Sequence, residues 1–173
     1  DYLPSPLERN PVAAIDPNTK DKKDVPLSED APFSAYVFKS ISDPFVGQLT
    51  VFRIFSGKLA SNTGFFNVTR GSRERIGSLL LVQGKEQRSI ANASCGDIVA
   101  VAKLKDTVLG DVLCDEKHQV LFDPMVFPEP VYSSSVKPKT RQDEEKISEA
   151  LHKLAAGDPT LKVSRDMQTK ELV

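Results

Sequence analysis

The chain has 173 residues, of which 39% are hydrophobic and 27% charged, as expected for a soluble globular protein of one or two small domains. Its formal net charge of −1 creates no overall field that attracts nucleic acid, so any RNA contact must come from a local patch. No run approaches the ~18 consecutive apolar residues of a membrane span, and the start lacks the basic and apolar regions of a signal peptide. The start also lacks an initiator methionine, which indicates a piece of a longer protein. We expect a cytoplasmic protein with neither membrane nor DNA partners.

The first 31 residues show no hydrophobic periodicity. They contain five prolines and a charged run over residues 20–24. We therefore expect residues 1–31 to form a linker that is partly ordered at Tyr2 and Leu3 and otherwise mobile.

Two strands joined by a turn are predicted in the first long hydrophobic stretch. Apolar residues mark one strand at about residues 33–41 and a second at about 48–55. Asp43 and Pro44 open the turn, because proline fixes φ and its predecessor favours an extended backbone. Gly47 then lets the chain bend again. Both faces of the second strand are apolar, which indicates a barrel or sandwich strand covered on both sides.

Short apolar runs separated by turns continue to about residue 115. Further strands are predicted around residues 65–68, 75–82 and 98–104, with a loop at 84–87 and a turn at 95–97. Turns at intervals of ~8–12 residues are typical of a closed barrel. No helical pattern intervenes, which argues against a parallel sheet. We therefore predict a β-barrel over residues 32–122.

Isolated polar residues in this region carry no recognisable catalytic or metal-binding pattern. Arg53 is a charge on an apolar strand face, and we expect it at a strand rim with a carboxylate partner. Cys95 and Cys114 are too few for a disulfide scaffold and are predicted to be partly buried thiols in a reducing compartment. His118 and His152 are isolated, so we predict no metal site and no catalytic residues.

The hydrophobic pattern changes after a proline-containing boundary at residues 123–130. One short strand is predicted at 131–136, and a helix follows, with an apolar stripe at Ile147, Ala150, Leu151, Leu154 and Ala155. Strands are predicted at 160–164 and from residue 171. The order β-α-β-β over residues 131–173 is the first part of a ferredoxin-like domain. Because the chain stops inside that domain, we expect this region to be weakly stable or supported by a neighbour.

One basic cluster stands out, at Arg70, Arg73 and Arg75 in a turn with glycine and serine. Guanidinium groups bind phosphate oxygens through paired donors, so the cluster is a candidate RNA contact. The alternative is a solvated turn in which Glu74 pairs with one arginine. A phosphate-binding loop of the type Gly-x-x-x-x-Gly-Lys-Ser/Thr is missing, so the chain itself is predicted not to be an enzyme.

Several short motifs, in order, resemble the second domain of translational GTPases of the elongation factor G type. The first is Asp43-Pro44-Phe45-Val46-Gly47, followed by Arg53 and Ser56-Gly57. The later ones are Arg73-Glu74-Arg75-Ile76-Gly77, Gly96-Asp97-Ile98, Leu104-Lys105-Asp106-Thr107, Gly110-Asp111 and Leu113-Cys114. Phe127-Pro128-Glu129-Pro130-Val131 resembles the family's entry to its third domain. Each motif is short, but their collinear order covers essentially the whole chain.

The resemblance implies a mainly β protein, with a translation-factor-type β-barrel followed by a truncated ferredoxin-like α+β segment. It implies docking on the RNA of the small ribosomal subunit and relay of the nucleotide state of a GTP-binding domain outside this chain. The other partners are then that domain and the later domains of the same protein, and GTP and Mg²⁺ belong to the parent protein and not to this chain. The candidate RNA contacts are Lys39, Asp43, Pro44, Phe45, Gly47, Arg70, Arg73 and Arg75.

Two alternatives remain open. Where the main elongation factor has a segment of the type His-Ala-Asn-His-Arg, this chain has Gln83-Gly84-Lys85-Glu86-Gln87. That departure favours a paralogue, with a role in translocation or in a related step such as ribosomal protection or recycling. A different class of function is a regulatory or substrate-binding barrel of a metabolic enzyme, and a phosphate-binding loop upstream of Asp1 would exclude it.

Overall fold

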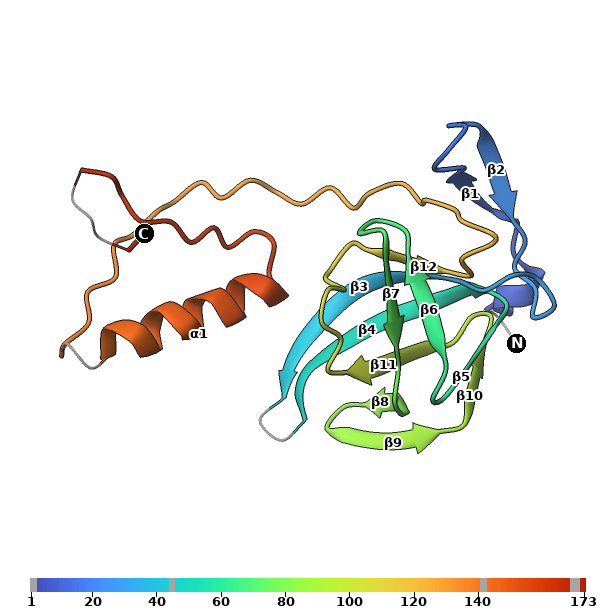
Figure 1. Cartoon of the computed structure of the whole chain (residues 1–173), viewed down its shortest axis with the longest axis horizontal. Helices are drawn as coiled ribbons and strands as arrows, with labels where there is room; N and C mark the ends of the chain where they lie inside the picture. The colour runs from blue at the N-terminus through green and yellow to red at the C-terminus, as the bar shows by residue number, and fades with distance from the viewer. Residues whose placement is uncertain (1–2, 44–45, 141–142, 169–171) are drawn as a thin grey trace. The chain divides into compact units, whose positions relative to one another are not determined.

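The computed structural model describes residues 3–43, 46–140, 143–168 and 172–173, with only the backbone described at 144 and 145 (Figure 1). The chain divides into two units, Asp1–Pro124 (unit 1) and Met125–Val173 (unit 2). Within the described residues, none of the helices combines the length and the apolar character needed to cross a membrane.

Unit 1 is built on an eight-stranded antiparallel sheet with the order β7-β6-β12-β3-β4-β11-β8-β9. Its strands are β3 (Ser34–Asp43), β4 (Gly47–Ser56), β6 (Gly64–Asn67), β7 (Ser72–Arg75), β8 (Leu79–Gln83), β9 (Glu86–Ile90), β11 (Ile98–Ala102) and β12 (Val112–Cys114). A second pair is β5 (Lys58–Ala60) with β10 (Asn92–Ser94). The mainly β class predicted from the sequence is confirmed, and the strands curve around a common interior in Figure 1.

The core of unit 1 collects inward-facing side chains from nearly every strand. Phe52 and Ile54 of β4 are fully buried in it, together with Leu79 and Leu113. On the other face of β4, Leu49 is also fully buried. The prediction of a strand covered on both faces is therefore confirmed. Full burial of a side chain of this size contributes roughly 1.5–3 kcal/mol to folding, so β4 is central to the stability of the unit.

Two predictions inside the sheet need correction. The run at residues 75–82 is not one strand, because the backbone leaves β7 after Arg75 and joins β8 only at Leu79. Between them, Ile76 donates to the Thr63 carbonyl at 2.9 Å, and the Gly77 carbonyl accepts from Asn62 at 2.8 Å. The loop predicted at 84–87 is a two-residue turn, since β9 already begins at Glu86.

Gly57, between β4 and β5, occupies a position that admits no side chain. Its φ is +74°, and a Cβ there would lie 2.7 Å from the backbone of Phe33 and of Ala31. Its N–H donates to the Ser28 carbonyl at 2.8 Å. Glycine therefore lets the N-terminal segment pack directly against the sheet.

The segment predicted to be an irregular linker contains regular structure. A 3-10 turn, η1 (Pro6–Glu8), precedes a hairpin of β1 (Val12–Ile15) and β2 (Lys22–Val25). Ala14 and Val25 are buried against Val120, with Phe122 packed beside them. The expectation was wrong here because the strands have only four residues each and β2 is mostly polar. The apolar residues that cover them come from about 100 residues further along the chain.

Unit 2 contains the helix α1 (Asp143–Gly157), as predicted from its apolar stripe. The Thr140 hydroxyl donates to an Asp143 carboxylate oxygen at 2.6 Å at the start of the helix. The strands expected at 131–136 and 160–164 are not formed, and their region holds only the isolated bridges Val136↔Leu172 and Arg165↔Leu172 in the described part of the chain. The strand expected to start at residue 171 begins outside the described residues. Val131 is fully exposed, so nothing covers the apolar face that a paired strand requires.

Candidate functional site

The three candidate arginines lie on the turn between β6 and β7 and on β7 itself, a segment (residues 67–75) that we call the arginine turn. Asn67 closes the turn: its side-chain oxygen accepts from the Arg70 N–H at 3.0 Å, and its carbonyl accepts from Gly71 at 2.8 Å. Gly71 has a φ of +68°, which glycine adopts without strain. The turn is therefore fixed by its own residues.

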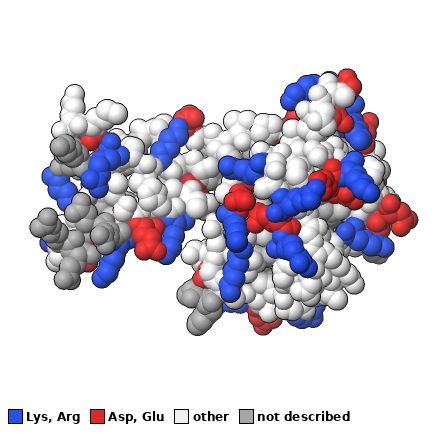
Figure 2. All heavy atoms as spheres, in the orientation of Figure 1, with Lys and Arg blue, Asp and Glu red and all other residues white. Residues whose placement is uncertain are grey.

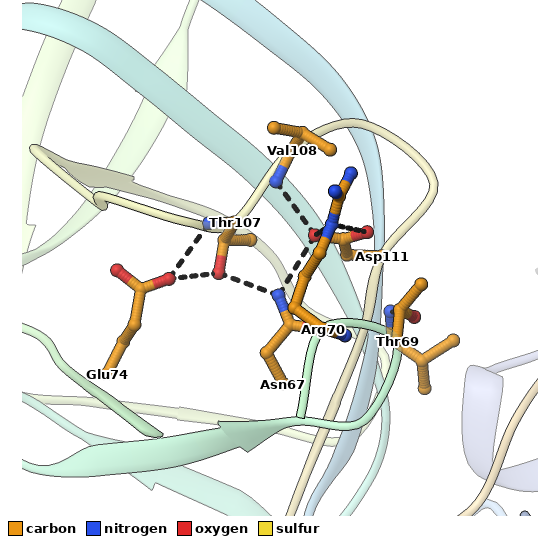
Figure 3. Close-up of polar contacts among 8 residues, drawn as sticks. Asn67, Thr69, Arg70, Glu74, Thr107, Val108 and Asp111 are labelled. Atoms are coloured by element: carbon orange, nitrogen blue, oxygen red, sulfur yellow. Dashed lines mark hydrogen bonds and ion pairs between the residues drawn. The ribbon is translucent and has the colours of Figure 1, made fainter. Parts of the chain in front are cut away.

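Arg70 is held in place by a buried carboxylate. Its Nε is 3.3 Å from both oxygens of Asp111, whose side chain is only 2% exposed (Figure 3). Asp111 also accepts from the Val108 N–H and from the Asn67 side-chain amide, each at 2.9 Å. Figure 3 shows the two terminal nitrogens of Arg70 pointing away from this carboxylate. Arg70 is about half exposed, so one edge of its guanidinium is anchored and the other faces outward.

The proposed pairing of Glu74 with an arginine is wrong. Strand alternation turns Glu74 inward, where it is only 9% exposed, between the outward-facing Arg73 and Arg75. Its carboxylate accepts from the Lys105 N–H at 2.7 Å and from the Thr107 N–H at 2.9 Å, and also from the Thr107 hydroxyl. Glu74 therefore fixes the loop before β12 and does not neutralise the arginines.

Arg73 and Arg75 occupy the exposed side of an edge strand. Arg73 is 73% exposed and pairs with Glu116, which is itself partly exposed. Arg75 is exposed and makes no ion pair with another described residue. An exposed pair of this kind is worth only ~0–1 kcal/mol, so Glu116 holds Arg73 weakly.

The other candidates lie on the β3–β4 hairpin. The pairing of β3 with β4 is irregular between Val37 and Lys39, and the side chains of β3 become more exposed there, whereas β4 stays buried as far as Leu49. Val37 is fully buried, whereas Lys39 is exposed. At the tip, Asp43 pairs with Gly47 and accepts from the Val46 N–H at 3.0 Å. Pro44 and Phe45 lie outside the described residues.

The candidates thus form two groups on different strand pairs, with β12 between β6 and β3 in the sheet order. Sequence reasoning missed the residues that position each group. Asn67 and Asp111 hold the arginine turn, and the Gln87 side chain donates to Asp43 at 2.7 Å on the hairpin. These partners are 41 to 44 positions apart, so no local pattern reveals them.

Comparison with known proteins decides the family. The model of elongation factor G domain 2 matches residues 32–116, and that of elongation factor G domain III matches residues 127–173. Elongation factor G from Dehalococcoides mccartyi strains BAV1 and CBDB1 is 45% identical over 173 residues, all of this chain and 25% of each relative. The chain belongs to the elongation factor G family. It spans about a quarter of the length of these curated relatives.

A solved structure has a similar fold. A crystal structure from Thermus thermophilus aligns with a TM-score of 0.71 and 31% identity, covering 83% of this chain and 22% of that one. The elongation factor G domain 2 match lies inside unit 1, and the domain III match lies inside unit 2.

The charged surface of this elongation factor G segment is mixed. In Figure 2, basic and acidic side chains are interspersed on the visible face. Lys58, for example, pairs with Glu29 at 2.8 Å, and this hydrogen-bonded pair lowers the pKa of Glu29 and raises that of Lys58. Arg53 makes no ion pair with a described carboxylate, contrary to expectation, and its guanidinium lies 5.9 Å from the centre of the Phe55 ring. No broad basic patch is visible on this face.

Beside the arginine turn, an open pocket of about 600 Å³ has an apolar lining that includes Leu59 and Phe65. Cys114 also lines it, and burial raises the pKa of that thiol to about 11. A protonated thiol is a poor nucleophile and a poor metal ligand. Within the described residues, no three His, Cys, Asp or Glu side chains gather to hold a metal ion.

Proposed function

We propose that unit 1 docks an elongation factor G-like translational GTPase on the RNA of the small ribosomal subunit, with the arginine turn contacting phosphates. The observation that carries the proposal is the anchoring of Arg70 Nε by the buried Asp111, which leaves the terminal nitrogens outward. An arginine oriented before binding loses little side-chain freedom when it meets a phosphate. Arg73 and Arg75 extend the same exposed edge.

The parent protein's reaction then lies outside this chain. GTP and Mg²⁺ bind to a separate GTP-binding domain. The role of unit 1 is to hold that domain in position on the ribosome. Unit 2 belongs to the path by which later domains sense the nucleotide state. The ribosomal step served is translocation or a related step, and the Gln83–Gln87 segment favours a paralogue of the main factor. Calorimetry of this chain with GTP and Mg²⁺ should show no micromolar binding.

A salt series tests the docking directly. The triple variant R70A/R73A/R75A of the full-length protein should bind small ribosomal subunits more weakly in co-sedimentation. The dependence of log affinity on log salt should flatten by roughly 0.7–0.9 for each phosphate interaction that the substitutions remove. Circular dichroism checks that the fold is retained, because R70A removes the ion partner of the buried Asp111, whereas the exposed Arg73 and Arg75 contribute little to stability.

Two matched variants make the test specific. K20A/K22A/K23A removes three exposed cations from the N-terminal hairpin and should leave the affinity unchanged. R70K keeps the charge but loses the planar guanidinium that Asp111 orients, and it should weaken binding in spite of its charge. If the triple variant folds and binds like the wild type, the docking surface lies elsewhere, with the Asp43–Gly47 turn and Lys39 as the next candidate.

A further inference from the structure

One hydrogen bond joins two hairpins of unit 1. The Gln87 side chain in β9 donates to Asp43 Oδ2 at the end of β3, at 2.7 Å and across 44 positions of sequence. The other oxygen of Asp43 accepts from the Val46 N–H at 3.0 Å. Asp43 is thus bonded to its own turn on one side and to β9 on the other.

This contact crosses the sheet. Three strands, β4, β11 and β8, lie between β3 and β9 in the sheet order. The curl of the sheet brings the end of the β3–β4 hairpin beside the β8–β9 hairpin, as Figure 1 shows. Between Leu49, the last buried residue of β4, and the turn, Gln48 and Gly47 are exposed, so a contact at the tip holds the part of the hairpin that lies outside the core.

Exposed cations occupy both hairpins. Lys39 lies on β3 just past the irregular pairing, and Lys85 and Arg88 lie on the turn and strand of the β8–β9 hairpin. The carboxylates among them are Asp43, which is bonded as described, and Glu86. These cations are separated from one another, and they lie on two hairpins that are hydrogen-bonded together. Such an arrangement is complementary to the row of phosphates along an RNA backbone.

We propose that Gln87 is a positioning residue that holds the β3–β4 hairpin against the β8–β9 hairpin, so that Lys39, Lys85 and Arg88 form one surface for RNA phosphates. The inference rests on the proposed docking function and extends it beyond the arginine turn. Because the two hairpins are already fixed to each other, binding does not have to order them. The residue type at position 87 then sets the geometry of the surface without contacting RNA.

The affinity for small subunits and its dependence on salt distinguish a positioning residue from a residue that contacts RNA. In the full-length protein, Q87A should weaken binding to small subunits by about two- to tenfold, the effect of one net hydrogen bond, with an unchanged salt slope. K85A/R88A should instead reduce the slope by roughly 0.7–0.9 for each phosphate interaction removed. Q83A removes an exposed glutamine from the other strand of the same hairpin and should bind like the wild type.

A donor–acceptor exchange provides the sharpest readout. Q87E places two carboxylates together and should weaken binding more than Q87A. Adding D43N restores a hydrogen bond with donor and acceptor reversed and with the original total charge, so D43N/Q87E should return to within about twofold of the wild type.

The outcomes distinguish a failure of the positioning role of Gln87 from a failure of the proposed docking function. If Q87A binds like the wild type, or if D43N/Q87E fails to rescue Q87E, Gln87 is not a positioning residue, although salt-dependent wild-type binding still supports docking. An unchanged slope for K85A/R88A removes the second hairpin from the surface. Wild-type binding that does not respond to salt overturns both the docking function and this extension of it.

Discussion

Unit 1 and unit 2 differ in where their stabilising contacts come from. The strands of unit 1 are paired across long stretches of sequence and enclose a core whose central residues, such as Phe52 and Leu79, are fully buried. In the described part of unit 2 the regular element is a helix, whose hydrogen bonds are local, while Val131, Tyr132 and Leu154 are largely exposed. A helix satisfies its own backbone, whereas a strand depends on partners and on a second layer.

The largest expected contrast is in hydrogen exchange. Amides of Val51, Ile54, Val99 and Val101 in the central strands should exchange only through global unfolding of unit 1. The amides of Ile147 and Leu151 in α1 should exchange through local opening of the helix. The free energy of this opening should be close to zero, far below the free energy of global unfolding of unit 1. Mass spectrometry or NMR of the 173-residue chain measures both. Equal protection in the two regions would show that they unfold as one cooperative unit.

A pair of core substitutions should differ by several kcal/mol. Phe52→Ala removes a fully buried ring from unit 1 and should cost about 3–5 kcal/mol of unfolding free energy, because it leaves a cavity. Leu154→Ala in unit 2 removes a side chain that is already 60% exposed and should cost no more than about 0.5 kcal/mol. Urea unfolding followed by circular dichroism measures each change. A large loss of stability for Leu154→Ala would mean that its apolar stripe is covered in solution.

The polar contacts should show the same contrast on a smaller scale. Asn67→Ala removes one of the donors to the buried Asp111 and the donor to the Thr107 hydroxyl, and it opens the arginine turn, so it should cost about 1–3 kcal/mol. Thr160→Ala breaks an exposed 2.6 Å bond to Asp158 and should cost less than about 0.5 kcal/mol. The same urea measurement applies, and similar losses of stability for both would contradict the importance of burial.

The sequence was sufficient to predict the elements whose signal is local. The alternation around Phe52 and the spacing of Ile147, Leu151 and Leu154 specified a doubly covered strand and a helix, and both are present. The order of short strands without a helical pattern also predicted the mainly β class. In each case the hydrophobic period belongs to a continuous segment, so it can be read without knowing its partners.

The remaining features depend on partners far away in the sequence. The burial of Val25 requires Val120, and the orientation of Arg70 requires Asp111. The contact of Gln87 with Asp43 depends on the curl of the whole sheet. The strand expected around Val131 failed for the opposite reason, since its local pattern was adequate but no covering layer is present among the described residues.

The ends of the eight-stranded sheet have a consequence for solubility. The sheet ends at β7 and β9, and each of these edge strands has unpaired backbone groups that another copy of the chain can add to. Both are short and carry charges, with Arg73 and Arg75 on β7 and Glu86 and Arg88 on β9. Charged edges discourage edge-to-edge aggregation. The arginines proposed to bind phosphates therefore also keep neighbouring copies of the protein apart, so selection on one property constrains the other.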